Sequence, residues 1–175
     1  MTRYGKLAVL AALAGATAMI AVAARAGGDK IAFPANYDKG VMYWSFDRAD
    51  NKQHREYFAP AAAIEAAKKG QPLPQGTAIT MLQYSTKLGA DGNPEKDANG
   101  KFIKDKLVAY AVMQKGAGWG AEYPDDVRNG EWEYQVFTAD KAVNEKANLK
   151  ACFGCHKPKA SADYLFTLEQ MKASK

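Results

Sequence analysis

Both cysteines of the chain and one of its two histidines stand together near the C-terminus, in Cys152-Phe153-Gly154-Cys155-His156. A C-x-x-C-H segment of this kind suits the covalent attachment of haem. Its two thiols can reach the two vinyl groups on one edge of the porphyrin, while the adjacent imidazole binds the iron. The segment therefore predicts a single haem c held by Cys152 and Cys155, with His156 as an axial iron ligand.

The first 26 residues predict a secretory signal peptide. Arg3 and Lys6 form a positive start, residues 7–24 are an uninterrupted run of apolar and small residues, and Ala24-Arg25-Ala26 offers a small-x-small cleavage site. We expect a single mature domain of residues 27–175 in the periplasm, where haem c is attached after export. A retained membrane anchor is the alternative, because the run is about long enough to span a bilayer.

Three other interpretations use the same two thiols. A disulfide between Cys152 and Cys155 is compatible with an oxidising compartment. A thioredoxin-like redox pair would need a βαβ setting, whereas this segment lies near the C-terminus. A zinc site would need a fourth ligand, and the other histidine, His54, is distant in sequence. The combination of C-x-x-C-H with an export signal favours haem.

The charge of the mature chain argues against nucleic-acid binding. The full sequence has 24 basic and 19 acidic residues, a net charge of +5. Cleavage would remove Arg3, Lys6 and Arg25, which leaves 21 basic residues against 19 acidic ones. Such a balanced chain has no large basic field for a polyanion, and its 47% apolar content is that of a globular protein.

Hydrophobic periodicity and turn residues predict an α+β fold. Strands are expected at residues 41–46, 54–58, 77–86, 106–114 and 131–138. Helices are expected from Pro60 to Lys69, from a cap at Asp140 to about Leu149, and from Ser161 to about Met171. Successive strands joined by hairpin loops indicate an antiparallel five-stranded sheet. A crossover helix would follow the second strand, and the C-terminal helices would carry the haem c motif.

This order of elements resembles the superfamily of cytochrome P460 and the sheet-type cytochromes c′ (c′-beta). The resemblance implies a homodimer of antiparallel sheets, with haem between the sheet and the C-terminal helices and His156 on its proximal side. Members of the family include hydroxylamine-oxidising enzymes and proteins that bind nitric oxide and carbon monoxide. The parts that carry the resemblance are Asn36-Tyr37 with Val41-Met42, Lys68-Lys69-Gly70, the strand begun by Gly76, Trp132 to Phe137, and the C-x-x-C-H segment followed by residues 160–167.

Met81 is the main departure from the hydroxylamine-oxidising members. The resemblance places it, five residues after Gly76, where those members have a lysine bonded to the porphyrin edge. A thioether cannot form the amine-type bond, and Lys69 and Lys87 lie outside the strand, so we expect no lysine cross-link and poor hydroxylamine oxidation. Met81 could line an open distal pocket, serve as a sixth iron ligand, or pack in the core.

Other candidate residues each have a more ordinary alternative. Glu145 could relay protons in catalysis or be a solvated carboxylate. His54 could bind iron, but a half-exposed strand histidine is the simpler interpretation. Arg128 could pair with a haem propionate or lie on a surface loop. The lysines at 150, 157 and 159 could steer an acidic redox partner or form a solvated face. Further candidates are Met42 and Met113 for the iron, Met171 for packing, and Trp44, Phe46, Tyr84, Tyr110, Trp132 and Tyr134 for the haem pocket.

The sequence thus predicts a periplasmic mono-haem c-type cytochrome that binds nitric oxide, carbon monoxide or peroxide at the iron and exchanges electrons with a redox partner protein. One alternative is an electron carrier whose iron is held by His156 and Met81. Another is a hydroxylamine-oxidising or peroxidase-like enzyme. An open sixth position favours the binder or the enzyme, whereas a closed low-spin iron favours the carrier.

Overall fold

The computed structural model describes residues 30–175. The predicted signal peptide, its cleavage site and the start of the mature domain at residue 27 lie outside the described residues. None of the helices between residues 30 and 175 combines the length and the apolar character that crossing a membrane requires.

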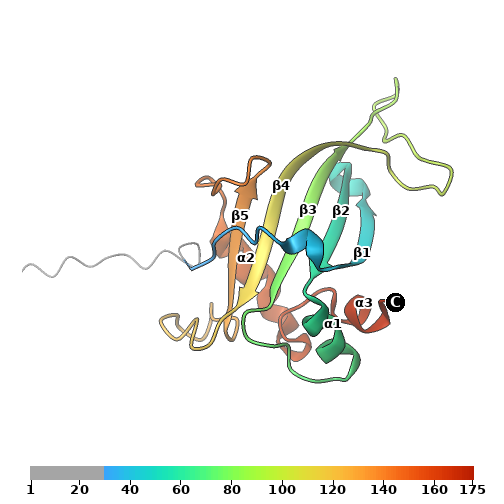
Figure 1. Ribbon diagram of the computed structural model, residues 1–175. Coiled ribbons are helices and arrows are strands. Elements are labelled where there is room, and N and C mark those ends of the chain that lie inside the picture. Colours follow the sequence, from blue (N-terminus) through green and yellow to red (C-terminus); the bar gives the residue numbers. More distant parts are fainter. Residues whose placement is uncertain (1–29) are drawn as a thin grey trace, which may run out of the picture.

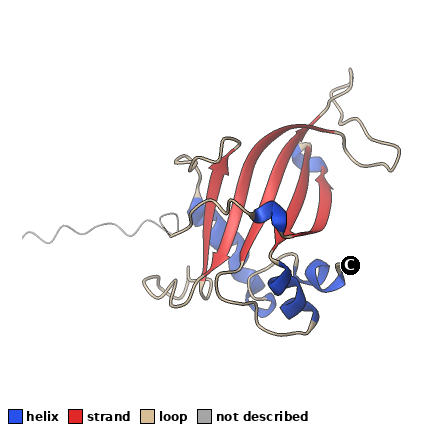
Figure 2. Cartoon of the chain, in the orientation of Figure 1, coloured by secondary structure: helices blue, strands red, loops and turns tan. Residues whose placement is uncertain are grey.

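The described chain folds around a five-stranded antiparallel sheet in which each strand pairs with the one that follows it (Figures 1 and 2). This arrangement confirms the predicted α+β class. Alternation of apolar and polar side chains predicts the last strand most clearly, whereas residue composition predicts the first. The strands are β1 (Val41–Arg48), β2 (Gln53–Ala59), β3 (Ala78–Thr86), β4 (Lys104–Lys115) and β5 (Trp132–Thr138).

Short helices connect and flank the strands. Helix α1 (Ala61–Lys68) lies between β2 and β3, as predicted; it begins after Pro60 and ends before Gly70, whose φ of +64° suits a residue without a side chain. The remaining helices are α2 (Leu149–His156) and α3 (Leu168–Ala173), with 3-10 turns η1 (Tyr37–Lys39), η2 (Ala49–Asn51) and η3 (Lys157–Ala162).

The helix predicted from Asp140 to Leu149 is wrong. The backbone reverses tightly instead, because the Lys141 N–H donates to the Thr138 carbonyl and the Thr138 N–H donates to the Ala142 carbonyl. Lys141 has a φ of +67°, which a helix does not allow. The helix begins later, behind Asn148, whose side-chain oxygen accepts the N–H of Ala151.

The helix predicted from Ser161 to Met171 is correct only at its end. Ser161 lies in η3, and the chain then passes through Asp163 and Tyr164, which both have left-handed backbone conformations. Two such residues interrupt a right-handed helix. Helix α3 therefore starts at Leu168, after Thr167.

The two faces of the sheet are covered by different parts of the chain (Figure 1). The N-terminal segment covers one face, where Phe33 packs edge-on against Tyr110 and Phe137, with ring centroids 4.9 and 5.3 Å apart. The helices cover only part of the other face, where α2 packs against β5 and α3 against β1. Their shared core contains Ala63, Ile64, Leu73, Ile79, Met113, Trp132, Tyr134, Phe153, Leu165 and Met171, among others.

Candidate functional site

The C-x-x-C-H residues form the last turns of α2. Cys152 and Cys155 are three residues apart, which places both thiols on the same side of the helix. Both thiols are free; Cys152 is half-buried and Cys155 is exposed. Burial raises the pKa of the Cys152 thiol. Within residues 30–175 no three His, Cys, Asp or Glu side chains are grouped to hold a metal ion, so the zinc interpretation finds no ligand set there.

His156 presents one ring nitrogen to the backbone and keeps the other available. Its Nδ1 lies 2.6 Å from the carbonyl oxygen of Tyr164. Because a carbonyl can only accept, Nδ1 carries the proton and Nε2 retains its lone pair. Burial lowers the pKa of His156, which favours the neutral ring. This is the protonation state that a metal-binding imidazole needs.

Aromatic rings hold the imidazole on two sides. The Tyr134 ring centroid is 4.9 Å from that of His156, and the Phe166 centroid is 5.0 Å away in an edge-on arrangement. Fully buried Asn129 donates to both the Tyr134 hydroxyl, at 2.9 Å, and the Phe153 carbonyl, at 3.0 Å. Asn129 thereby joins α2 to β5 beside the histidine.

On the face of the sheet that bears Tyr134, the helices bury that residue but leave the next rows of side chains half-buried. Side chains two apart on a strand, and directly paired across strands, share a face. Tyr134 contacts His156 and Phe153, so the half-buried residues that continue this face lie on the same side as α2. We call them the open sheet face: Trp44, Tyr57, Met81, Ala111 and Val136 in one row across the five strands, and Phe46, Arg55, Gln83 and Thr138 in the next.

The residues present fit a haem group. Two free thiols and an available imidazole nitrogen stand on α2, and the open sheet face is mainly apolar and aromatic, as a haem pocket must be. Ala111 and Ala109 leave space above the centre of this face, because their side chains are single methyl groups. The arrangement has the donors and the apolar wall that the C-x-x-C-H segment requires.

Met81 lies at the centre of the open sheet face, half-buried and paired with Tyr57 and Ala111. It shares this side with Ile79, as its spacing predicts. The other methionines are placed differently. Met113 and Met171 are buried in the core, and Met42 is 52% exposed.

His54 lies on a strand, as predicted, but it is buried rather than half-exposed. The ring is satisfied in its buried position, because Asp47 accepts its Nδ1–H at 2.6 Å and Glu56 lies 3.8 Å from its Nε2. His54 pairs with Tyr84, which belongs to the core under the N-terminal segment. His54 therefore lies on the opposite side of the sheet from His156 and from the open sheet face.

The predicted aromatic residues divide between the two faces. Trp44 and Phe46 stack with centroids 4.6 Å apart on the open sheet face, and Trp132 and Tyr134 lie in the core beneath the helices. Tyr84 and Tyr110 belong to the opposite face.

The remaining predicted charges surround α2. Glu145 is exposed in a turn that precedes the helix. Arg128 is half-buried, and its backbone carbonyl accepts the Lys157 ammonium at 2.7 Å. Lys159 lies over the Phe166 ring at 5.1 Å, and Lys150 is exposed.

Sequence reasoning missed Tyr164, Asn129 and Arg55 as parts of the site. Tyr164 contributes only its carbonyl, which carries no sequence signal. Arg55 is half-buried on the open sheet face, with a guanidinium nitrogen 3.0 Å from the Gln53 side-chain oxygen. Burial is the main influence that lowers the pKa of Arg55. The sequence signal that could have indicated it is its spacing from Tyr57, two residues later on the same strand.

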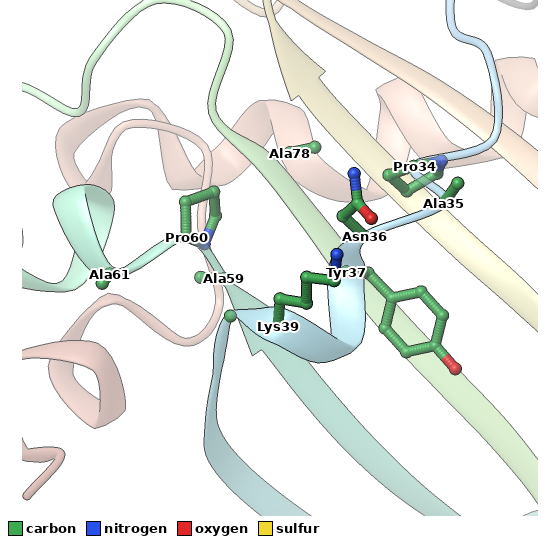
Figure 3. A pocket seen from close by; sticks show the side chains of 10 residues that line it. Pro34, Ala35, Asn36, Tyr37, Lys39, Ala59, Pro60, Ala61 and Ala78 are labelled. Carbon is green, nitrogen blue, oxygen red and sulfur yellow. The ribbon is translucent and has the colours of Figure 1, made fainter.

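A separate hollow of ≈ 410 Å³ lies away from this site (Figure 3). Residues of the N-terminal segment and η1 line it, together with the junction of β2 and α1. Pro60, Asn36 and Lys39 lie around it, and none of the predicted site residues does. It therefore contributes nothing to the haem interpretation.

One comparison with known families matches most of the described chain. The family model described as Cytochrome P460 matches residues 34–167, which include all five strands, α1 and α2. No curated protein was found to match the chain.

Proposed function

Because the chain belongs to the cytochrome P460 family and is a haem-binding cytochrome, we propose that it carries one haem c and binds a small ligand at the iron. Cys152 and Cys155 hold the haem covalently, and His156 is the axial ligand. The ligand is nitric oxide, carbon monoxide or peroxide, with nitric oxide the first choice. The protein is exported to the periplasm, works as a homodimer and exchanges electrons with a redox partner protein.

One observation carries this proposal. The Tyr164 carbonyl holds the His156 imidazole through Nδ1 and leaves Nε2 free. His156 belongs to α2, which lies on the same side of the sheet as the half-buried open sheet face. The bound group would supply an iron on which a diatomic ligand coordinates. The chain's own residues orient the imidazole, through Tyr134 and Phe166, and limit water with the apolar side chains of the open sheet face.

The haem has no lysine cross-link in this proposal. Strand β3 contains no lysine, and Met81 occupies its centre. Lys115 on β4 is already paired with Asp163, its ammonium 2.9 Å from the carboxylate. We therefore do not expect the protein to oxidise hydroxylamine by a route that depends on such a cross-link.

An electron carrier is the second candidate, and the position of Met81 favours it. Its thioether lies half-buried on the open sheet face rather than in the closed core. A thioether bound opposite His156 would close the iron to added ligands and raise its reduction potential.

Absorption spectra of the exported, haem-loaded protein distinguish the two candidates. Spectra are recorded ferric and ferrous, with and without nitric oxide, for the wild type, Met81→Leu and the control Met113→Leu, whose methionine is buried on the next strand. High-spin bands that shift with nitric oxide in all three proteins support ligand binding. A methionine–iron charge-transfer band that only Met81→Leu abolishes, without a nitric oxide response in the wild type, would refute it in favour of the carrier.

A further inference from the structure

The turn that follows the C-x-x-C-H helix contains two consecutive non-glycine residues in the left-handed region. Asp163 has φ +50° and Tyr164 has φ +61°. Such conformations are uncommon for residues with side chains, and especially for a bulky one such as tyrosine. A conformation of this kind persists only when its surroundings hold it.

Side chains from the sheet hold the first of these residues. The Asp163 carboxylate accepts the indole N–H of Trp132 at 3.1 Å through one oxygen. Its other oxygen accepts the Lys115 ammonium at 2.9 Å. Trp132 and Lys115 are paired residues of β5 and β4, and the ammonium lies 5.6 Å from the centre of the indole. We call these three residues the Asp163 clamp.

The Asp163 clamp holds the chain next to the hydrogen-bond acceptor of His156. Trp132 is fully buried, and the Lys115 side chain is 12% exposed, so two of its three members are fixed in the protein. The residue that follows Asp163 is Tyr164, whose carbonyl oxygen accepts the His156 Nδ1–H at 2.6 Å. The Tyr164 ring in turn packs against Gly130, where an added Cβ would come within 3.1 Å of it.

We propose that Asp163 is a positioning residue for His156. By tying the turn to β4 and β5, it holds the Tyr164 carbonyl at the Nδ1–H and so fixes the orientation and basicity of the imidazole. This inference rests on the proposed function, in which Nε2 of His156 binds the iron. Asp163 touches neither the haem nor its ligand in this proposal, and acts only through the turn.

The hydrogen bond at Nδ1 has a defined electronic effect. A well-oriented acceptor draws the Nδ1 proton and makes Nε2 a stronger donor to a metal. Loosening the clamp weakens that donation, which destabilises the ferric state relative to the ferrous one. The reduction potential should therefore rise, and the iron–histidine stretching band of the ferrous protein should move to lower frequency.

The test uses the haem-loaded protein with Asp163→Ala, Trp132→Phe and Lys115→Gln. The control is Lys104→Gln, since Lys104 is another β4 lysine, paired with Glu56 and remote from the turn. Asp163→Ala removes both bonds, and Trp132→Phe removes one donor while retaining an aromatic ring in the core. We expect Asp163→Ala to raise the ferrous-to-ferric ratio at a fixed potential about tenfold, equivalent to ~59 mV for one electron.

The single-bond variants should show smaller shifts in the same direction. Trp132→Phe removes the bond from a fully buried indole and is expected to give about threefold. Lys115→Gln should give about twofold, because solvent weakens an ion pair whose carboxylate is partly exposed. Lys104→Gln should leave both the potential and the iron–histidine band unchanged. Should Asp163→Ala fail to fold, Trp132→Phe and Lys115→Gln decide the matter with the same two readouts.

The outcomes separate this inference from the proposed function. If the variants carry covalent haem but keep the wild-type band and potential, Asp163 has no positioning role, while the haem site stands. If the wild-type protein itself carries no thiol-linked haem, the proposed function fails first. A shift in the Lys104→Gln control equal to that of Trp132→Phe would also overturn the inference, because the effect would then not depend on the turn.

Discussion

Replacing Asn129 with alanine should destabilise the protein far more than replacing an exposed asparagine. Asn129 is fully buried and donates to the Tyr134 hydroxyl at 2.9 Å and to the Phe153 carbonyl at 3.0 Å. Burial also raises the pKa of Tyr134, so its hydroxyl stays neutral and needs hydrogen-bond partners within the protein. The substitution removes a link between α2 and β5 beside His156.

The expected loss of stability depends on the two polar groups that lose Asn129 as their donor, the Tyr134 hydroxyl and the Phe153 carbonyl. A buried polar group that loses its partner costs about 1–3 kcal/mol. The Phe153 carbonyl keeps a second partner, the N–H of Lys157, so its share belongs at the lower end of that range. Together the two lost bonds should lower the free energy of unfolding by ~2–4 kcal/mol, a large part of the ~5–15 kcal/mol typical of a domain.

Urea unfolding of the haem-loaded protein, followed by far-ultraviolet circular dichroism, measures this loss. The matched control is Asn51→Ala, because Asn51 is exposed and donates to the Gln53 side chain at 3.1 Å. The control should change the free energy of unfolding by less than ~0.5 kcal/mol. Equal effects of the two substitutions would refute the role assigned to Asn129.

Two further predictions concern charge. Burial raises the pKa of Tyr84 to about 12, with a smaller contribution from Glu56. The unfolded chain therefore loses the Tyr84 hydroxyl proton at a lower pH than the folded protein. The contribution of Tyr84 to the free energy of unfolding should be complete below about pH 10 and fall as the pH rises towards 12. Urea midpoints that stay constant from pH 9 to pH 12 would contradict it. Arg55→Met should weaken cyanide binding to the ferric protein by about tenfold, because the half-buried cation of the open sheet face acts in a low dielectric, and should leave nitric oxide binding nearly unchanged. An equal loss for both ligands would show that Arg55 acts through packing rather than charge.

The regular parts of the fold were predictable because they depend on local pattern. Strand β5 alternates clearly and was located almost to the residue, and α1 is bounded by Pro60 and Gly70, which favour the start and the end of a helix. Spacing also predicts that Met81 and Ile79 share one face of β3, whereas the placement of Met81 towards the haem is implied by the family resemblance.

The remaining features depend on contacts between distant residues. Nothing in the sequence near Asp163 and Tyr164 indicates left-handed backbone, since neither is glycine and their support comes from Trp132 and Lys115. The partner of the buried His54 ring is Asp47, which stands opposite it on β1, and only the strand register brings the two together. Asp140 resembles a helix cap locally, but hydrogen bonds across the turn decide its conformation.

Tandem mass spectrometry of the proteolysed mature protein tests the proposed haem attachment most directly. The proposal predicts a single haem-bearing peptide that contains residues 152–156, bonded through both cysteines, with no second peptide attached to the haem. Free or disulfide-linked Cys152 and Cys155 in the exported protein would contradict the proposed haem c. A haem joined also to a lysine peptide would contradict the position assigned to Met81 and favour the hydroxylamine-oxidising enzyme.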